Sequence, residues 1–492
     1  MINAFHYSCE GESHKAINKV GQDYSSTSII DDLAVAIVCD GHGGDRYFRS
    51  NIGSQCAVDA TLEAVTFFVE KVGDSLFKGK KYTAVGPTSS LKDAEDLSEA
   101  DSAFRQLFSS IIYKWNEKIK AHAKSEPLTE WEKTNVPQQY LDEFLQSETF
   151  EKHYGCTLMT YVQTSKYWFA FHIGDGKCIS FQKDPIWKEP IPWDEKCFLN
   201  ETTSLCDNSP IDEFRYCYEG DGNFPIAVML GSDGIDDSFG ETTNLVNFYI
   251  QVLKMLAKEG VESTKASVIE TLPQLSKIGS KDDMSVACVF NLDQVKENIN
   301  LYIRYQIDRT NKDLNDIEEK INHLKNRIDS LASFYDEKSK IEFKYAVKDL
   351  KRAFSTREKL AEKHNHLVEE LPEGMVRPYY IEDEDYVIPT IEQQTPEKDG
   401  TPEDDGTPEK DGITEKEKTA EKEEIADPDK TETETHAVSD VDSEESGNKE
   451  AQTLPEASPK PQAKKFGSHG MKRFGFKKPI PQKKNRKGRR KR

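Results

Sequence analysis

Short acidic motifs recur along roughly the first 290 residues, and each lies beside an apolar run. Asp40 ends the run at 33–39, Asp233 follows the run at 225–230, and Asp282 precedes the run at 285–292. Such runs read as buried strands, which hold a carboxylate at their end in a fixed position. Carboxylate oxygens are the ligands that Mg²⁺ and Mn²⁺ prefer. The pattern therefore predicts a shared divalent-cation site and a metal-dependent hydrolase.

Two divalent ions that share a carboxylate can lower the pKa of a water held between them. Hydroxide then becomes available near neutral pH, and the same ions take charge off phosphate oxygens during in-line attack. The chain has no C-x₅-R loop, no P-loop and no G-x-S-x-G motif. Because these motifs carry the main covalent and nucleotide-dependent alternatives, metal-assisted hydrolysis is favoured.

The elements that must position these aspartates occur in blocks of strands and helices. Strands are predicted over 33–39, 157–162, 167–173, 177–181, 225–230 and 285–292. Helices are predicted over 54–72, 104–123 and 245–256, whereas 73–100 and 124–150 read as polar loops. Blocks of this kind, without strict strand–helix alternation, favour an α+β fold in which an antiparallel sheet sandwich is flanked by helices.

A different pattern begins after residue 291. Apolar residues between 303 and 331 fall at alternating spacings of four and three, and a looser version continues to 371. This is an a/d seam of about four heptads. We therefore predict a catalytic domain at 1–295 and a coiled coil or helical hairpin at 296–371. The alternative is a surface helix of the catalytic domain.

The last quarter of the chain is strongly charged. Residues 372–456 are acidic and contain three TPEKDG-type repeats with nothing apolar to bury, so this segment is predicted to be disordered. Residues 457–492 hold about fifteen Lys or Arg and no Asp or Glu. This basic tail, also predicted to be disordered, could bind nucleic acid, an acidic partner or the chain's own acidic segment.

Cysteine usage and hydropathy point to a cytoplasmic protein. The chain has nine cysteines, an odd number, and no C-x-x-C pair, which favours a reducing compartment without structural disulfides or zinc. The first residues lack the features of a signal peptide, and no run is long and apolar enough to span a membrane. We expect no membrane partner.

The ordered set of motifs resembles that of the metal-dependent protein phosphatases of type 2C, over residues 1 to about 292. The matching motifs are D-G-H-G-G at 40–44, G-D at 174–175, S-D-G-x-x-D at 232–237 and D-D-M-S-V at 282–286. The opening G-E-S-H at 11–14, followed by Gln22-Asp23, is similar to the largely bacterial branch. The resemblance implies a four-layer αββα sandwich with a binuclear Mn²⁺ or Mg²⁺ centre.

The same resemblance implies the ligands of that centre. Asp40 would bridge the two ions, the Gly41 carbonyl would bind one of them, and Asp233 and Asp282 would hold the other. Further residues match positions linked to the metals less directly: Gln22 through water, and Asp175 with Asp237 at a third, weaker ion. Asp23 would orient the attacking water, and His42 would be the general acid that protonates the leaving oxygen.

This chain differs from the family pattern at two positions where a charged residue is frequent. Many members have glutamate where Gln22 stands, and many have an arginine that grips the substrate phosphate where this chain has Asn18. Lys15 or Lys19 could substitute for that arginine. A third departure, Asp283 in place of a frequent asparagine, is milder.

The resulting hypothesis is a protein serine/threonine phosphatase that acts on phosphoproteins. Its coiled coil would set the oligomeric state or recruit a partner such as a cognate kinase. The alternative is a catalytically weak or inactive phosphatase-like scaffold that acts through its coiled coil and charged tail.

Overall fold

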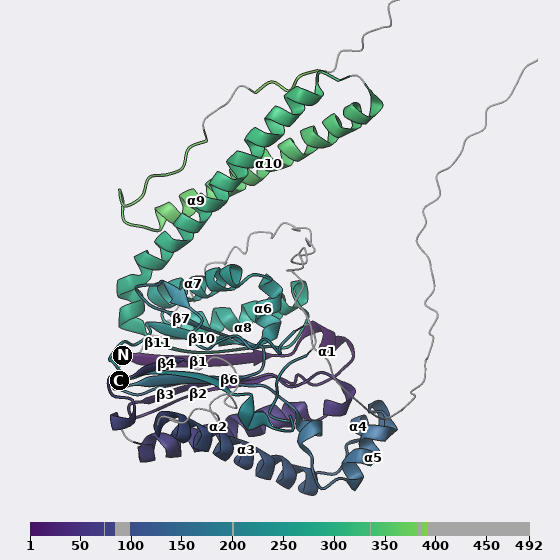
Figure 1. Ribbon diagram of the computed structural model, residues 1–492, viewed down its shortest axis with the longest axis vertical. Coiled ribbons are helices and arrows are strands. Elements are labelled where there is room, and N and C mark those ends of the chain that lie inside the picture. Colours follow the sequence, from purple (N-terminus) through teal and green to yellow (C-terminus); the bar gives the residue numbers. More distant parts are fainter. Residues whose placement is uncertain (73, 84–98, 199–200, 335, 382–385, 391–492) are drawn as a thin grey trace, which may run out of the picture. The chain divides into compact units, whose positions relative to one another are not determined.

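The computed structural model describes residues 1–72, 74–83, 99–198, 201–334, 336–381 and 386–390 (Figure 1). These residues belong to one compact unit, Met1–Glu397. The acidic repeats and the basic tail lie outside the described residues, so their predicted disorder stays a prediction. No described helix is both long enough and apolar enough to cross a membrane.

Two antiparallel sheets form the centre of the part of the chain up to Asn291 (Figure 1). The first has the order β1 (Ile2–Cys9), β11 (Met284–Asn291), β10 (Ala227–Gly231), β7 (Lys177–Phe181) and β8 (Trp187–Lys188). The second has the order β2 (Tyr24–Ile30), β3 (Leu33–Cys39), β5 (Leu158–Gln163), β6 (Trp168–Ile173), β9 (Arg215–Glu219) and β4 (Lys81–Thr83).

Alternation along β3 explains how the layers pack. Small side chains on one face, such as Ala34 and Ala36, contact Val228 and Ala287 of the other sheet. The opposite face, including Ile37, joins the core beneath the helices. Because both faces are covered, every residue of β3 is buried, and the strand reads as a continuous apolar run.

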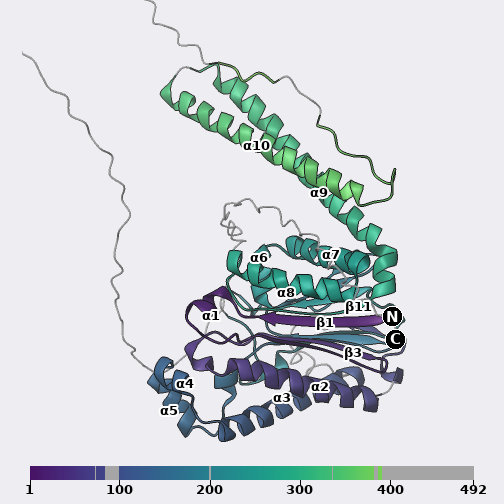
Figure 2. The same cartoon turned by 180° about the vertical axis from the view of Figure 1, so that it is seen from behind.

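Helices cover the outer face of each sheet (Figures 1 and 2). The long pair α2 (Ser50–Val72) and α3 (Glu99–Ser125) covers the second sheet, and α7 (Thr242–Glu259) with α8 (Val261–Ile278) covers the first. Trp115 of α3 is fully buried and donates its indole N–H to the Gly53 carbonyl at 3.0 Å, which fixes α3 against α2. The predicted αββα sandwich is confirmed.

Several elements differ from the sequence-based expectation. Residues 124–150 contain α4 (Glu130–Asn135) and α5 (Gln138–Gln146), and 73–100 contain β4. The six-residue α4 is too short to show a period, but Thr129 and Glu132 form a capping box at its start. Helix α8 was missed because it contains Pro273. Strands β1, β2 and β9 were also missed, since polar residues interrupt their apolar pattern.

The predicted coiled-coil segment forms two paired helices, α9 (Leu292–Leu331) and α10 (Glu337–Glu369). Ile321, Leu324 and Ile328 of α9 pack against Ala346, Leu350 and Ala353 of α10. The start of α9 joins the core under α7 through the buried Tyr302. Lys254 of α7 forms an ion pair with Glu370 at 2.6 Å. A partner for the seam thus comes from the same chain.

The chain after Pro372 also differs from expectation. Its described residues, 372–381 and 386–390, return along the helix pair instead of leaving it. The Asn365 side chain pairs with the Tyr379 backbone at 2.7 and 2.9 Å, and the Tyr386 hydroxyl donates to Asp329 at 2.9 Å. Tyr379 and Tyr386 thus attach this part of the acidic stretch to the two helices, which its acidic composition did not lead us to expect.

Candidate metal centre

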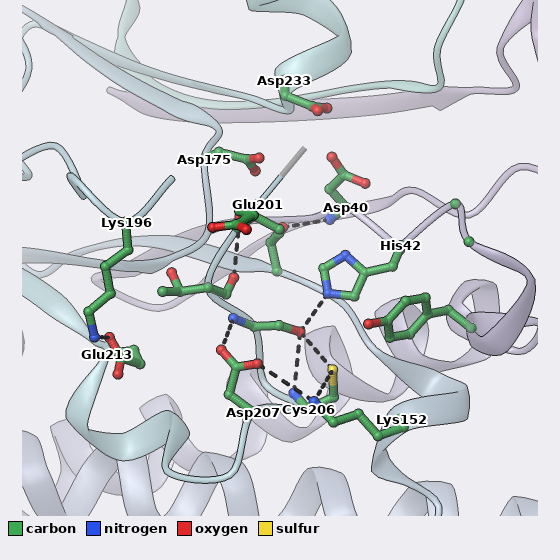
Figure 3. A pocket seen from close by; sticks show the side chains of 18 of the residues that line it. Asp40, His42, Lys152, Asp175, Lys196, Glu201, Cys206, Asp207, Glu213 and Asp233 are labelled. Atoms are coloured by element: carbon green, nitrogen blue, oxygen red, sulfur yellow. Dashed lines mark hydrogen bonds and ion pairs between the residues drawn. The ribbon is translucent and has the colours of Figure 1, made fainter. Parts of the chain in front are cut away.

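A cavity of about 1170 Å³ opens where strands of the two sheets end (Figure 3). Most of the aspartates singled out from the sequence line it, namely Asp40, Asp175, Asp233, Asp237 and Asp282. Figure 3 shows Asp40, Asp175 and Asp233 gathered at one end of this cavity and Lys152, Cys206 and Asp207 at the other. The predicted convergence of distant aspartates is therefore present in the fold.

Each aspartate is fixed by the element that carries it. Asp40 follows β3, and its backbone is tied to Thr157 by hydrogen bonds of 3.0 and 2.8 Å. Asp175 follows β6 in a turn where Gly174 has a φ of +127°, a conformation that favours glycine. Asp233 begins α6 (Asp233–Phe239), where the helix dipole favours a carboxylate. Asp237 lies one turn later on the same helix face.

The carboxylates lie so close together that they repel one another when all are charged and no cation is present. Oxygens of Asp40, Asp175 and Asp233 all lie within 4.8 Å of one another. Burial, followed by the charge of Asp233, raises the pKa of Asp175 to about 7 and that of Asp237 to about 6. The same two causes raise the pKa of Asp40 well above its ordinary value. An all-oxygen donor set with this excess of negative charge fits hard divalent cations.

Asp23 does not line the cavity, but the charges of Asp283 and Asp233 act on it, and it supports the same conclusion. Its Oδ2 is buried and has no hydrogen-bond partner in the described part of the chain. Burial, then the charges of Asp283 and Asp233, raises the pKa of Asp23 well above its ordinary value. A buried carboxylate oxygen without a donor suits a site that is completed by a cation or its water.

Gln22 does not line the cavity, and its predicted contact with a metal through water stays a prediction. Its Nε2 donates to the His42 carbonyl at 2.9 Å and to the Ser50 hydroxyl. A Cβ on Gly41 would lie 2.5 Å from the Gln22 carbonyl, so only glycine fits between Asp40 and His42. Gln22 therefore braces the 40–44 loop, where its neutral amide can donate to carbonyl oxygens as a glutamate could not.

His42 lines the cavity between the aspartates and the loop at 201–209. Its Nε2 lies 2.7 Å from the Ser204 hydroxyl, and Tyr47 packs edge-on against its ring. Burial, then the charge of Lys152, lowers the pKa of His42 to about 4. The ring is therefore neutral near pH 7 in the absence of a ligand.

The cations at the cavity are not those considered from the sequence. Asn18 and Lys15 do not line it, and Lys19 donates to the Gly43 carbonyl at 2.6 Å. Lys152 and Lys196 do line it; Lys196 pairs with Glu213 at 2.6 Å, whereas Lys152 lies 3.8 Å from Asp207. These lysines belong to no acidic motif, so no pattern in the sequence points to them.

His14 is a further residue of the cavity that was not among the predicted site residues. It lines the cavity, and its Nδ1 lies 2.9 Å from Asp283 Oδ1. Burial acts to raise the pKa of Asp283. The hydrogen bonds from His14, Gln22 and Gly11 outweigh burial and hold the pKa below its ordinary value. The signal for His14 was its place in the G-E-S-H motif.

The chain is similar to several known proteins. A family model for protein phosphatase 2C matches residues 10–272. Solved structures similar to this chain include the serine/threonine phosphatase Stp1 from Staphylococcus aureus, at 14% identity, with 59% of this chain and 95% of that chain covered and a TM-score of 0.35. No curated protein matches.

Two further structures are similar to a comparable degree. The Mycobacterium tuberculosis serine/threonine phosphatase PstP/Ppp shares 15% identity, with 59% of this chain and 98% of that chain covered and a TM-score of 0.35. The catalytic domain of a PstP in complex with two manganese ions shares 15% identity, with 59% and 97% covered and a TM-score of 0.34.

Proposed function

The chain belongs to the protein phosphatase 2C family, and on that premise we propose that it hydrolyses phosphoserine and phosphothreonine in phosphoproteins. One observation carries the proposal. The predicted aspartates, which come from four separate segments of the chain, line the same cavity as His42: Asp40, Asp175, Asp233 with Asp237, and Asp282. A site rich in negative charge repels a phosphate unless cations are also present, so the proposal includes a metal dependence.

The donor set indicates which residues would hold the metals. Asp40, the Gly41 carbonyl, Asp233 and Asp282 would bind two Mn²⁺ or Mg²⁺ ions, and Asp175 with Asp237 would bind a third, weaker ion. When bound, such ions supply a nucleophilic hydroxide near neutral pH and neutralise phosphate oxygens. Asp175 and Asp237 lie on different elements but couple electrostatically to Asp233, which supports a shared role.

The remaining steps belong to the chain's own side chains. Asp23 would accept a hydrogen bond from the attacking water through its unpartnered Oδ2. His42 would donate a proton from Nε2 to the serine or threonine oxygen as it leaves. An incoming phosphate carries negative charge, which raises the pKa of the imidazole and favours its protonated form. Nε2 lies 2.7 Å from the Ser204 hydroxyl, and this hydrogen bond would be exchanged for one to the leaving oxygen before the proton is transferred.

We also propose the division of labour along the chain. Residues 1–295 would be the phosphatase, and 296–371 would recruit a partner such as a cognate kinase or mediate self-association. The acidic segment at 372–456 and the basic tail at 457–492 would make charge-dependent contacts, the tail with nucleic acid or an acidic partner. A cytoplasmic location is consistent with the nine unpaired cysteines.

A non-catalytic scaffold is the rival function, and one observation favours it. Asn18 occupies the sequence position at which the family frequently has a phosphate-gripping arginine, and it carries no charge. It also does not line the cavity. A scaffold would still bind metal or a phosphopeptide at this site. It would not release phosphate at a rate that depends on the metal.

Phosphate release from phosphoserine peptides by the full chain separates the two functions. Activity with Mn²⁺ should fall to the EDTA background in Asp40→Asn and in Asp233→Asn. It should be unchanged in Asp59→Asn, which alters an exposed residue of α2. Activity that ignores Mn²⁺ or survives both cavity substitutions would overturn the mechanism, and no activity in any sample would favour the scaffold.

A further inference from the structure

Asp282 also belongs to a second group of potential metal ligands, which includes a histidine. A ring nitrogen of His14 and carboxylate oxygens of Asp282 and Asp283 all lie within 4.8 Å of one another. His14 belongs to the short helix α1 (Glu12–Ala16), is 9% exposed and lines the same cavity as Asp282. An imidazole thus lies beside a carboxylate that we propose as a metal ligand.

The backbone holds His14 close to Asp282. Ser13 donates to the Lys281 carbonyl from its backbone N–H at 2.9 Å and from its hydroxyl at 2.7 Å. A Cβ on Gly11 would lie 2.4 Å from the Asp282 carbonyl carbon, so α1 begins in direct contact with the loop that carries Asp282. The approach of the imidazole to that loop is therefore built into the fold.

Asp283 determines which ring nitrogen is available. Its Oδ1 accepts from the Gly11 N–H at 2.6 Å and pairs with His14 Nδ1 at 2.9 Å, and its Oδ2 accepts from the Gln22 N–H. A carboxylate with this many donors acts as an acceptor, so Nδ1 carries the hydrogen. In the neutral ring, Nε2 then offers a lone pair. None of the described residues forms a hydrogen bond with Nε2.

We propose that His14 Nε2 is a nitrogen ligand of the divalent ion that Asp282 holds, an inference that depends on the metal centre of the proposed function. The Asp283–His14 pair has the arrangement of metal-ligating histidines, which donate their other N–H to a carboxylate. An imidazole ligand suits first-row transition metals such as Zn²⁺ and Fe²⁺, and to a smaller degree Mn²⁺, better than Mg²⁺, which demands oxygen ligands. The site would therefore select for a transition metal.

The position of His14 distinguishes it from structural histidines of this chain. His172 is fully enclosed beside Arg215, and His153 Nδ1 lies 3.2 Å from the Arg46 carbonyl. Neither lines the cavity. His14 instead combines an Nδ1 fixed by a carboxylate with a ring edge on the cavity. That combination is what a ligand requires and a core histidine does not.

Pulsed EPR of the full chain titrated with Mn²⁺ tests the proposal without an activity measurement. We expect nitrogen modulation of the Mn²⁺ signal that changes when the histidines carry ¹⁵N. His14→Gln should abolish it and weaken Mn²⁺ binding about 10–100-fold, with a smaller effect on Mg²⁺. His6→Gln is the matched control, because His6 lies on β1, bonds to Thr27 at 2.9 Å and does not line the cavity.

The outcomes separate this inference from the proposed function. A Mn²⁺-dependent phosphatase without histidine nitrogen coupling would overturn the His14 ligand alone. Coupling that is intact in a protein without phosphatase activity would overturn the enzyme and leave the ligand standing. If the His14→Gln variant does not fold, the His42→Asn variant provides the test. Nitrogen modulation of the Mn²⁺ signal that persists without His42 supports His14 as the ligand, and modulation that disappears contradicts it.

Discussion

The metal-free protein should become less stable as pH rises, and Asp175 lets the size of this effect be worked out. Its pKa is about 7 in the folded chain and 3.8 ordinarily. The folded state therefore binds the proton more tightly than the unfolded state, and stability is lost as pH rises from about 4 to about 7. A difference of about three pH units corresponds to about 4 kcal/mol at most.

Asp175→Asn removes this penalty because the amide carries no charge at any of these pH values. In EDTA at pH 8, the substitution should raise the free energy of unfolding by up to about 4 kcal/mol, and near pH 4 by less than about 1 kcal/mol. Urea unfolding followed by tryptophan fluorescence measures both values. Asp59→Asn, on the exposed face of α2, should change neither.

Added metal should stabilise wild type more than it stabilises the Asp175→Asn variant. The reason is that the bound ion relieves the repulsion between Asp175 and its acidic neighbours in wild type, whereas the amide of the variant has already removed that repulsion. The reasoning fails if the Asn variant is no more stable than wild type at pH 8 without metal. It also fails if the gain is equal at pH 4 and pH 8, because a gain of that kind would not come from charge.

Three further predictions follow from the same contacts. His42→Asn should lower kcat for a phosphoserine peptide by about 10²–10⁴-fold and affect p-nitrophenyl phosphate much less, because that leaving group needs no proton; equal losses on both substrates would contradict a general-acid role. Gly41→Ala should cost about 1–3 kcal/mol in urea unfolding and weaken Mn²⁺ binding in calorimetry, since its Cβ would press on the Gln22 carbonyl; unchanged binding would show that the loop adapts. Leu350→Ala should cost about 2–5 kcal/mol, because Leu350 is fully buried between α9 and α10, while Mn²⁺ affinity stays unchanged; an unaltered unfolding curve would mean that the two helices do not pair in solution.

The aspartates were predictable because each adjoins an apolar strand. β3 and β10 are buried at every residue, so their ends at Asp40 and Asp233 are visible as breaks in continuous apolar runs. The two-sheet sandwich could be expected for the same reason. Strand β1 could not be predicted, because polar residues interrupt its apolar pattern and its partner, β11, begins about 280 residues later.

Other parts of the site depend on contacts that leave no local pattern. His14 and Asp283 are 269 residues apart, and only the fold brings them together. Lys152 reaches the cavity from the short 3-10 helix Glu151–Tyr154 and Lys196 from a turn, and neither belongs to a motif. The heptads of 303–331 predicted a helix with a partner but could not say that the partner is α10 of the same chain, since a seam records only its own apolar face.

Anomalous diffraction at the manganese edge, from crystals grown with Mn²⁺, tests the central claim most directly. The account predicts at least two peaks in the cavity, with one bound by both Asp40 and Asp233 at a distance typical of Mn²⁺–oxygen bonds, about 2.0–2.6 Å. A cavity without manganese peaks, in a protein whose side chains are arranged as described above, would contradict it.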